Sequence, residues 1–291
     1  MNTGFRRIAI FLAAAAVSTS AIFTLWSDAS SITLVLYRML FASLIILPFL
    51  LIGCRKELRS LELRDLILCI ISGVVLAIHF AAYFESLRFT SIASSLVLVD
   101  TSVFFIAAIM LIFFRERISV KGWIAILITF GGVIVIALND FHSGNNSLYG
   151  DMLALLGSVM FAGYAVIGRR QRSRMSTTVY TFIVYLSAAL TALLVCVSVG
   201  DEIICDTTDL LCALGMAVFC TILGHSVFNW GLKYEKTSFI AVSSLLEPVF
   251  GSVLGFLVFS EIPATLIIIG SLIVLFGVYL FSANTEPELS E

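Results

Sequence analysis

Charged side chains are scarce in this sequence of 291 residues. Asp, Glu, Lys and Arg together make up 12% of the chain, whereas 60% of the residues are hydrophobic and the mean hydropathy is +1.10. A soluble domain carries about 25% charged residues, so the composition excludes an ordinary soluble globular protein. Since a membrane-spanning helix needs about 20 mostly apolar residues, we expect an all-α integral membrane protein.

Sequence motifs of several function classes are also missing. The chain contains no GxxxxGK[ST] loop, which excludes ATP as the direct source of energy. It contains no HExxH, no GxSxG and no paired-acid metal motif, so we expect no enzyme activity, no metal and no cofactor. No lysine lies inside an apolar run, which excludes a retinal Schiff base. We expect no nucleic-acid partner.

Long apolar runs are what the sequence does have. Their length favours helices over strands, and helices satisfy their own backbone groups, as lipid requires. We predict ten transmembrane helices, near residues 8–26, 32–52, 66–86, 91–114, 121–138, 149–168, 177–199, 210–231, 238–259 and 264–282.

The few basic residues alternate with the predicted helices. If the chain crosses the membrane ten times, fifteen of the 17 Lys and Arg residues fall on one side, Arg88 falls on the other, and Arg38 lies inside a span. Cytoplasmic loops carry such an excess, so we expect a multi-pass protein of the cell (inner) membrane with both termini cytoplasmic. The fifteen are Arg6, Arg7, Arg55, Lys56, Arg59, Arg64, Arg115, Arg117, Lys121, Arg169, Arg170, Arg172, Arg174, Lys233 and Lys236.

An internal repeat relates residues 87–116 to residues 232–261, at an offset of 145. Each half then holds five spans, and because five is odd the second half is inverted across the membrane. Inverted repeats are a common transporter architecture with the binding site at the repeat interface. We therefore predict two inverted five-helix repeats in a monomer or homodimer. The predicted bounds are 1–140 for the first repeat, 141–148 for a linker, 149–283 for the second repeat and 284–291 for a cytoplasmic tail.

Several segments resemble the EamA-type ten-helix members of the drug/metabolite transporter superfamily. They are SAIF (20–23), LYRMLFASLIILP (36–48), HFAAYFESLRFTSIASS (79–95), FFRERIS (113–119), GHSVFNWGLKY (224–234) and LLEPVF (245–250). The chain departs from the family pattern in having Val103 where a first-half proline is usual and an acid, Asp100, where the family is usually neutral. The resemblance implies transport of a small metabolite, most commonly an amino acid or a related solute.

Polar side chains inside the predicted spans are candidates for a substrate site. His79 and Tyr83 lie four residues apart and share a helix face, as do His225 and Asn229. Each stripe either lines a central cavity or holds helices together by hydrogen bonds. Arg38 pairs either with Asp100 or with a substrate carboxylate. The remaining substrate-binding candidates are the aromatic residues Trp26, Tyr185 and Trp230.

Coupling or gating is expected at three residues. Ionisable side chains inside a membrane are costly and face the protein interior or water, and Asp100 is the first candidate for handling a proton or cation. Glu247 either accepts hydrogen bonds at a kink made by Pro248 or takes up and releases a proton.

The sequence thus predicts a secondary active transporter that exports a small polar or amphipathic metabolite by alternating access. Its expected partners are the solute, membrane lipids, and protons or a cation. The alternative is a lipid or amphiphile flippase with the same architecture, which a groove open sideways to the bilayer would favour.

Overall fold

The computed structural model describes residues 3–114, 119–143, 145–171, 174–231, 243 and 246–284. Every regular element in these ranges is helical. In chain order the elements are α1 Thr3–Ser18, α2 Ser20–Trp26, α3 Ser31–Phe49, η1 Leu50–Cys54, α4 Arg55–Arg59, α5 Leu63–Ser86, α6 Ile92–Asp100, α7 Ser102–Phe114, α8 Val120–Ser143, α9 Asn145–Gln171, α10 Thr177–Val199, α11 Thr207–Gly215, η2 Met216–His225, α12 Ser226–Gly231, α14 Leu246–Phe259 and α15 Thr265–Asn284.

Six helical stretches of the described residues are long and apolar enough to cross a membrane, and shorter apolar helices accompany them. The protein is therefore a membrane protein, as its composition predicts. The six stretches are Phe5–Trp26, Ser31–Arg59, Leu63–Ser86, Ser147–Gln171, Thr177–Val199 and Thr207–Gly231, and the shorter ones are Ile92–Ile106, Val120–Ile136, Leu246–Phe259 and Thr265–Phe281. The first residues of the expected span 238–259 lie outside the described residues, and most of the expected linker 141–148 lies in the adjoining ends of α8 and α9.

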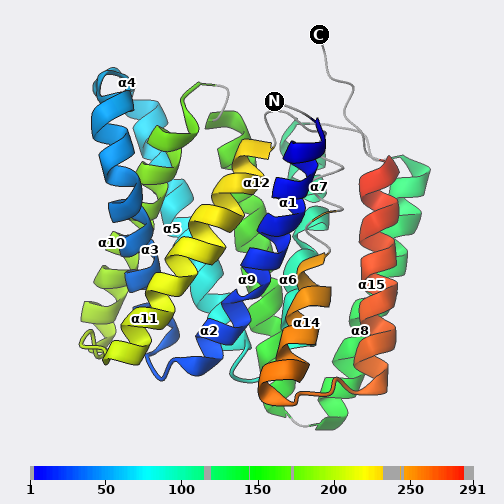
Figure 1. Ribbon diagram of the computed structural model, residues 1–291. Helices are drawn as coiled ribbons and strands as arrows, with labels where there is room; N and C mark the ends of the chain where they lie inside the picture. The colour runs from blue at the N-terminus through cyan, green and yellow to red at the C-terminus, as the bar shows by residue number, and fades with distance from the viewer. Residues whose placement is uncertain are drawn as a thin grey trace.

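The helices form one upright bundle in which segments far apart in sequence lie side by side (Figure 1). Helix α3 packs against α10, α5 against α9, and α8 against α15. The start of α1 and the end of α15 lie at the same end of the bundle. Large buried side chains such as Met39, Leu76 and Phe84 form the main core between these helices, and a smaller cluster around Ile136 and Val274 joins α8 to α15.

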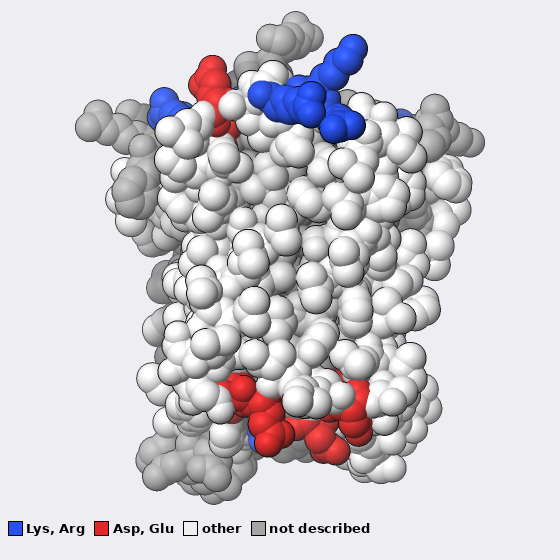
Figure 2. Space-filling view, turned by 90° about the vertical axis from the view of Figure 1, so that its left-hand side faces the viewer, with Lys and Arg blue, Asp and Glu red and all other residues white. Residues whose placement is uncertain are grey.

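Charges gather at the two ends of the bundle and leave an uncharged band between them. On the face in Figure 2, Lys and Arg cluster at the end that holds α4, where some Asp and Glu also lie, and the opposite end, where α10 is joined to α11, carries a cluster of Asp and Glu. The connection from α10 to α11 contains Asp201, Glu202 and Asp206. This distribution is the one that the alternation of basic residues along the sequence predicts. We refer to the two ends as the basic end and the acidic end.

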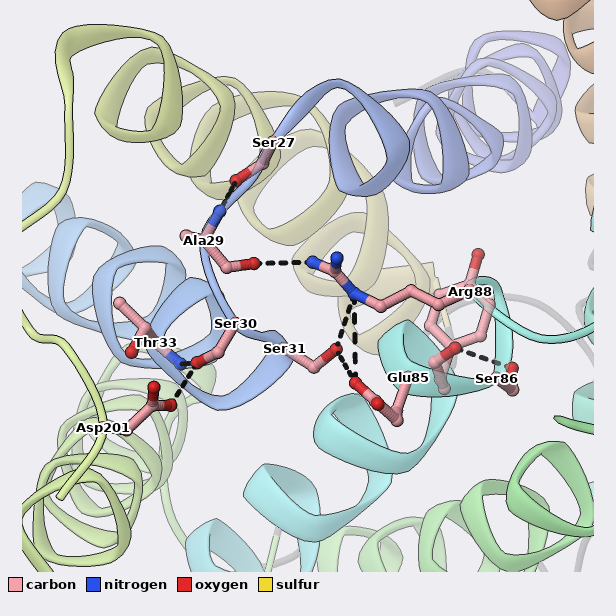
Figure 3. Close-up of polar contacts among 10 residues, drawn as sticks. Ser27, Ala29, Ser30, Ser31, Thr33, Glu85, Ser86, Arg88 and Asp201 are labelled. Atoms are coloured by element: carbon pink, nitrogen blue, oxygen red, sulfur yellow. Dashed lines mark hydrogen bonds and ion pairs between the residues drawn. The ribbon is translucent and has the colours of Figure 1, made fainter. Parts of the chain in front are cut away.

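At the acidic end, polar contacts hold the connection from α2 to α3 against two other parts of the chain (Figure 3). The Ser31 hydroxyl donates to Glu85 at 2.6 Å, and Arg88 donates to the Ala29 carbonyl and forms an ion pair with Glu85. Ser30 donates to Asp201 in the connection from α10 to α11. These contacts bind residues 27–31 to α5 and to the second half of the chain.

The segment that follows α14 is attached to α6 at the same end of the bundle. The Glu261 carboxylate accepts a hydrogen bond of 2.9 Å from the backbone N–H of Ile92, at the start of α6. Burial raises the pKa of this carboxyl, and the hydrogen bond offsets only part of that effect. Glu261 therefore holds its proton to a higher pH than an exposed glutamate does.

The basic end has contacts of its own between the halves. Arg174 lies 3.3 Å from the Asp65 carboxylate, and Gln171 donates to the Asp65 backbone carbonyl at 3.0 Å. The backbone N–H of Ser176 donates to Glu57. Helices α4 and α5 are thus attached to the region between α9 and α10.

Glycines let α8 and α15 approach closely, as small residues do in membrane helix pairs. A Cβ on Gly132 would lie 2.8 Å from the Gly270 carbonyl oxygen and 2.9 Å from the Val274 backbone nitrogen, whereas a Cβ on the adjacent Gly131 would meet nothing within 4 Å. Backbone atoms cannot yield as a flexible side chain does, so the two positions differ sharply.

We expect Gly132→Ala to destabilise the protein by about 1–3 kcal/mol through overpacking. Gly131→Ala is the matched control, and it should leave stability unchanged or raise it slightly because alanine favours helix. Thermal unfolding of both variants in detergent micelles measures the difference. Equal midpoints for the two variants would contradict the close packing of α8 against α15.

Candidate functional site

Interruptions of regular helix mark the interior of the bundle. The predicted run 91–114 is two helices, because α6 ends at Asp100 and α7 begins at Ser102 after a turn at Thr101. The middle of the stretch 207–231 is η2, whose wider π-type turns end at His225. Discontinuous helices form the binding sites of many transporters, and π-type turns frequently occur at functional sites. Asp100 and His225 each lie beside such an interruption.

Arg38 lies in the middle of α3 and is completely buried. Its Nε donates to the Thr221 hydroxyl of η2 at 2.9 Å, and its Nη1 donates to the Ser20 hydroxyl of α2 at 3.2 Å. Among the described residues no carboxylate lies within ion-pair distance of it, so the expected alternative of an Arg38–Asp100 pair is not the arrangement present here.

Aromatic rings connect Arg38 to the two histidines. The guanidinium carbon of Arg38 lies 4.0 Å from the centre of the Phe80 ring, a cation–π contact. The Phe80 ring is 4.8 Å from the His79 ring and 5.6 Å from the His225 ring, measured between centroids. Phe161 of α9 lies 5.1 Å from His79 and 6.2 Å from His225. These five side chains form one cluster, which we call the central cluster.

His79 both joins helices and presents a free ring nitrogen. Its Nδ1 lies 2.8 Å from the Gly157 carbonyl oxygen of α9, so Nδ1 carries the proton and donates it. In the neutral ring the Nε2 atom is then an acceptor. The Tyr83 ring stacks beside His79 at 6.4 Å, and its buried hydroxyl has no partner among the described residues.

The second expected stripe also makes contacts across helices. Asn229 Nδ2 donates to the Tyr164 hydroxyl of α9 at 3.2 Å, and the Tyr185 hydroxyl of α10 lies 3.2 Å from that of Ser226. Phe161 and Tyr164 are neighbours, with ring centroids 5.7 Å apart. Tyr185 and Asn229 are thereby attached to the central cluster through α9 and α12.

Two acidic residues of the predicted spans, Asp100 of α6 and Glu247 of α14, also belong to the bundle interior. Asp100 and Glu247 are close enough to interact electrostatically, and Arg38 also acts on Glu247. One carboxylate oxygen of Asp100, Oδ2, is buried without a partner in the described part of the chain. Pro248 is buried in the first described turn of α14, where its missing N–H costs little. The residues in which the predicted kink would begin lie largely outside the described residues.

The two expected tryptophans, Trp26 and Trp230, are not part of the central cluster. Trp26 ends α2 and is 52% exposed, with Phe23 as its ring neighbour. This placement suits an aromatic side chain at the membrane surface. Trp230 is partly exposed near the end of α12.

The sequence alone did not distinguish Phe80, Phe161, Tyr164 or Ser20 as site residues, whereas Thr221 lies one turn before His225 on the second expected stripe. Aromatic and hydroxyl side chains are common in apolar spans, so composition alone gives them no distinction. The available signal is positional, because Phe80 adjoins His79, and Phe161 and Tyr164 lie one turn apart on α9. In the described residues no group of three or more His, Cys, Asp or Glu side chains is placed to hold a metal.

Comparisons with known proteins relate most of the chain to transporters. Pseudopaline exporter CntI of Pseudomonas aeruginosa is 25% identical over 219 residues, covering 74% of this chain and 74% of that protein. An uncharacterized transporter of Archaeoglobus fulgidus is 23% identical over 258 residues, covering 86% of this chain and 87% of the relative. One solved crystal structure superposes with a TM-score of 0.68 at 17% identity and covers 96% of each chain, which shows a shared fold.

The profile of the EamA-like transporter family matches residues 6–138 and again residues 148–283, which together make up most of the chain. The named relatives are transporters and not enzymes. This chain therefore belongs to the EamA-like transporter family.

Proposed function

We propose that the protein is a secondary active transporter that exports a small polar metabolite across the cell (inner) membrane by alternating access. The observation that carries the proposal is the central cluster, where a buried arginine and two histidines meet between helices of both halves. Polar and charged groups inside a membrane are costly and accompany solute or ion pathways.

Two inverted units of five helices, ten spans in all, are part of this proposal. The family profile matches two successive segments, which supports a duplication. The packing fits the same relation. An inverted repeat makes α3 equivalent to α10 and α8 equivalent to α15, and each of these helices packs against its counterpart. It also makes the α5–α9 contact equivalent to the contact between α1 and η2, and both contacts exist.

An orientation with both termini in the cytoplasm is the further element of this proposal. The basic end, where α1 begins and α15 ends, would face the cytoplasm under the positive-inside rule. At the acidic end the hydrogen bond from Ser30 to Asp201 joins the two halves. Alternating access requires this contact to separate when the site opens outward.

Transport by the purified protein in liposomes tests the proposal. We expect the protein to accelerate the flux of at least one solute from a pool of amino acids and related metabolites, and a pH gradient to drive its accumulation. Protein-free liposomes give the baseline. Flux equal to that baseline for the whole pool, with and without the gradient, would refute the proposal.

A lipid or amphiphile flippase is the second candidate, and one observation favours it. An apolar groove of about 390 Å³ lies between α6, α14 and α15, lined by Val97, Pro248 and Phe256 among others. Its rim residues Val253 and Leu272 are more than half exposed, so the groove faces the bilayer. Movement of a fluorescent phospholipid between leaflets, without flux of any pooled solute, would select this candidate.

A further inference from the structure

Arg38 has hydrogen-bond donors that no described residue uses. A guanidinium has five N–H donors, and the two hydrogen bonds to Thr221 and Ser20 use one on Nε and one on Nη1. The Nη2 atom is buried and has no hydrogen-bond partner among the described residues. The end of the guanidinium formed by Nη1 and Nη2 thus retains three unused donors.

No carboxylate among the described residues contacts Arg38, and Glu247 acts on it only from beyond ion-pair distance. The groups that do contact it, hydroxyls and the rings of Phe80 and Phe84, are neutral. An arginine keeps its charge in proteins, and a buried ion without a counterion costs several kcal/mol. Such a cost is tolerated where an anion binds during function.

A second unmet donor lies beside the first. The Tyr83 hydroxyl is buried and has no partner in the described part of the chain, and Tyr83 interacts electrostatically with Arg38. Tyr83 follows Phe80 by three residues on α5, so it projects from the same helix face as the Phe80 ring, which the Arg38 guanidinium contacts. The two donors, from α3 and α5, therefore belong to the same part of the bundle interior.

We propose that Arg38 and Tyr83 form a subsite for the carboxylate of the transported solute. A carboxylate has two oxygens that match the planar fork of a guanidinium, and the tyrosine hydroxyl supplies a further donor. One guanidinium balances one negative charge, which favours a carboxylate over a doubly charged phosphate. The inference rests on the proposed transport function and narrows its substrates to solutes with a carboxylate.

The subsite also explains the hydroxyl partners of Arg38. Thr221 and Ser20 hold the guanidinium from η2 and α2, so its free end is fixed toward the interior. A side chain fixed before binding loses less conformational entropy when the ligand arrives. Arg38 would then bind the solute between helices of both halves.

Transport of matched solutes tests the subsite. The probes are L-amino acids, each compared with its α-carboxamide, which has nearly the same shape but lacks the carboxylate charge. In wild-type proteoliposomes we expect the KM of the acid to be at least about tenfold below that of the amide. In Arg38→Gln that ratio should fall to about one, and Arg38→Lys and Tyr83→Phe should give intermediate ratios.

Controls separate this role from a structural one. Arg174→Gln removes an arginine that pairs with Asp65 at the basic end, and it should leave the acid-to-amide ratio unchanged. If Arg38→Gln does not fold, Tyr83→Phe and Arg38→Lys still report the ratio. Thermal midpoints in detergent provide a second measurement, since the acid and not the amide should raise the midpoint of the wild type.

Each outcome decides the question. Equal KM values for acid and amide in the wild type would overturn the subsite and leave the transport function standing. An unchanged ratio in all three site variants would also overturn it. Failure of the wild type to move any solute of the pool would remove the proposed function and the subsite with it.

Discussion

Replacing Asp100 with asparagine is expected to abolish the accumulation of solute driven by a pH gradient, down to the level of protein-free liposomes. Asp100 ends α6 at the turn that interrupts the predicted span, and its Oδ2 atom is buried without a partner in the described structure. Glu247 and Tyr83 lie within electrostatic range. Neighbouring carboxylates in an apolar interior form a site that can hold and release a proton.

Solute exchange at equal pH should survive in Asp100→Asn, because asparagine has nearly the same shape and cannot take up the proton. Counterflow of labelled solute measures the exchange, and uptake against an imposed gradient measures the coupling. Asp65→Asn is the matched control, since it removes a buried carboxylate that pairs with Arg174 away from the interior acids. Normal accumulation by Asp100→Asn would reject the coupling role.

Glu247→Gln identifies which of the two acids is required. The structure gives Glu247 no hydrogen bond among the described residues, so the expected role as an acceptor at the Pro248 kink gains no support from the described contacts. Loss of accumulation in Glu247→Gln alone would move the proton site from Asp100 to Glu247. Loss in both variants would mean that the two carboxylates act as one unit.

Helix positions were predictable from the sequence where one apolar run forms one regular helix. The run 177–199 coincides with α10, and 66–86 lies within α5. Hydropathy measures side chains and not backbone geometry, so it could not place the turn at Thr101 or the π-type turns of η2. The run 91–114 therefore read as one span, although the chain breaks it in the middle.

The polar members of the central cluster were predictable for a different reason. Arg38, His79 and His225 stand out because such side chains are rare inside apolar runs. Phe80 and Phe161, which connect them, could not be distinguished from other apolar residues. The sequence could not assign Trp26, because an aromatic residue at the end of a span suits either a binding site or the membrane surface. Its exposure in the structure favours the membrane surface.

Replacing Asp209 with alanine should destabilise the acidic end by about 3 kcal/mol, because buried donors that lose a charged acceptor keep their desolvation cost. Asp209 is 8% exposed, and its Oδ1 accepts hydrogen bonds from the Ser27 hydroxyl at 2.7 Å and from the backbone N–H groups of Asp28 and Ala29 at 3.0 and 3.2 Å. Residues 27–29 connect α2 to α3, so the change releases this connection from α11. Unfolding in mixed micelles measures the loss.

Two controls isolate the interaction. Asp209→Asn keeps an oxygen acceptor in place and should cost about 1 kcal/mol, the difference between a charged and a neutral acceptor. Asp28→Ala removes an exposed carboxylate from the same connection and should leave stability nearly unchanged. A double-mutant cycle with Ser27→Ala measures the coupling directly. Additive effects of Asp209→Ala and Ser27→Ala in the cycle would contradict the contact between the two side chains. Because the contacts of Asp209 bind the two halves at the acidic end, Asp209→Ala should also favour the outward-open form.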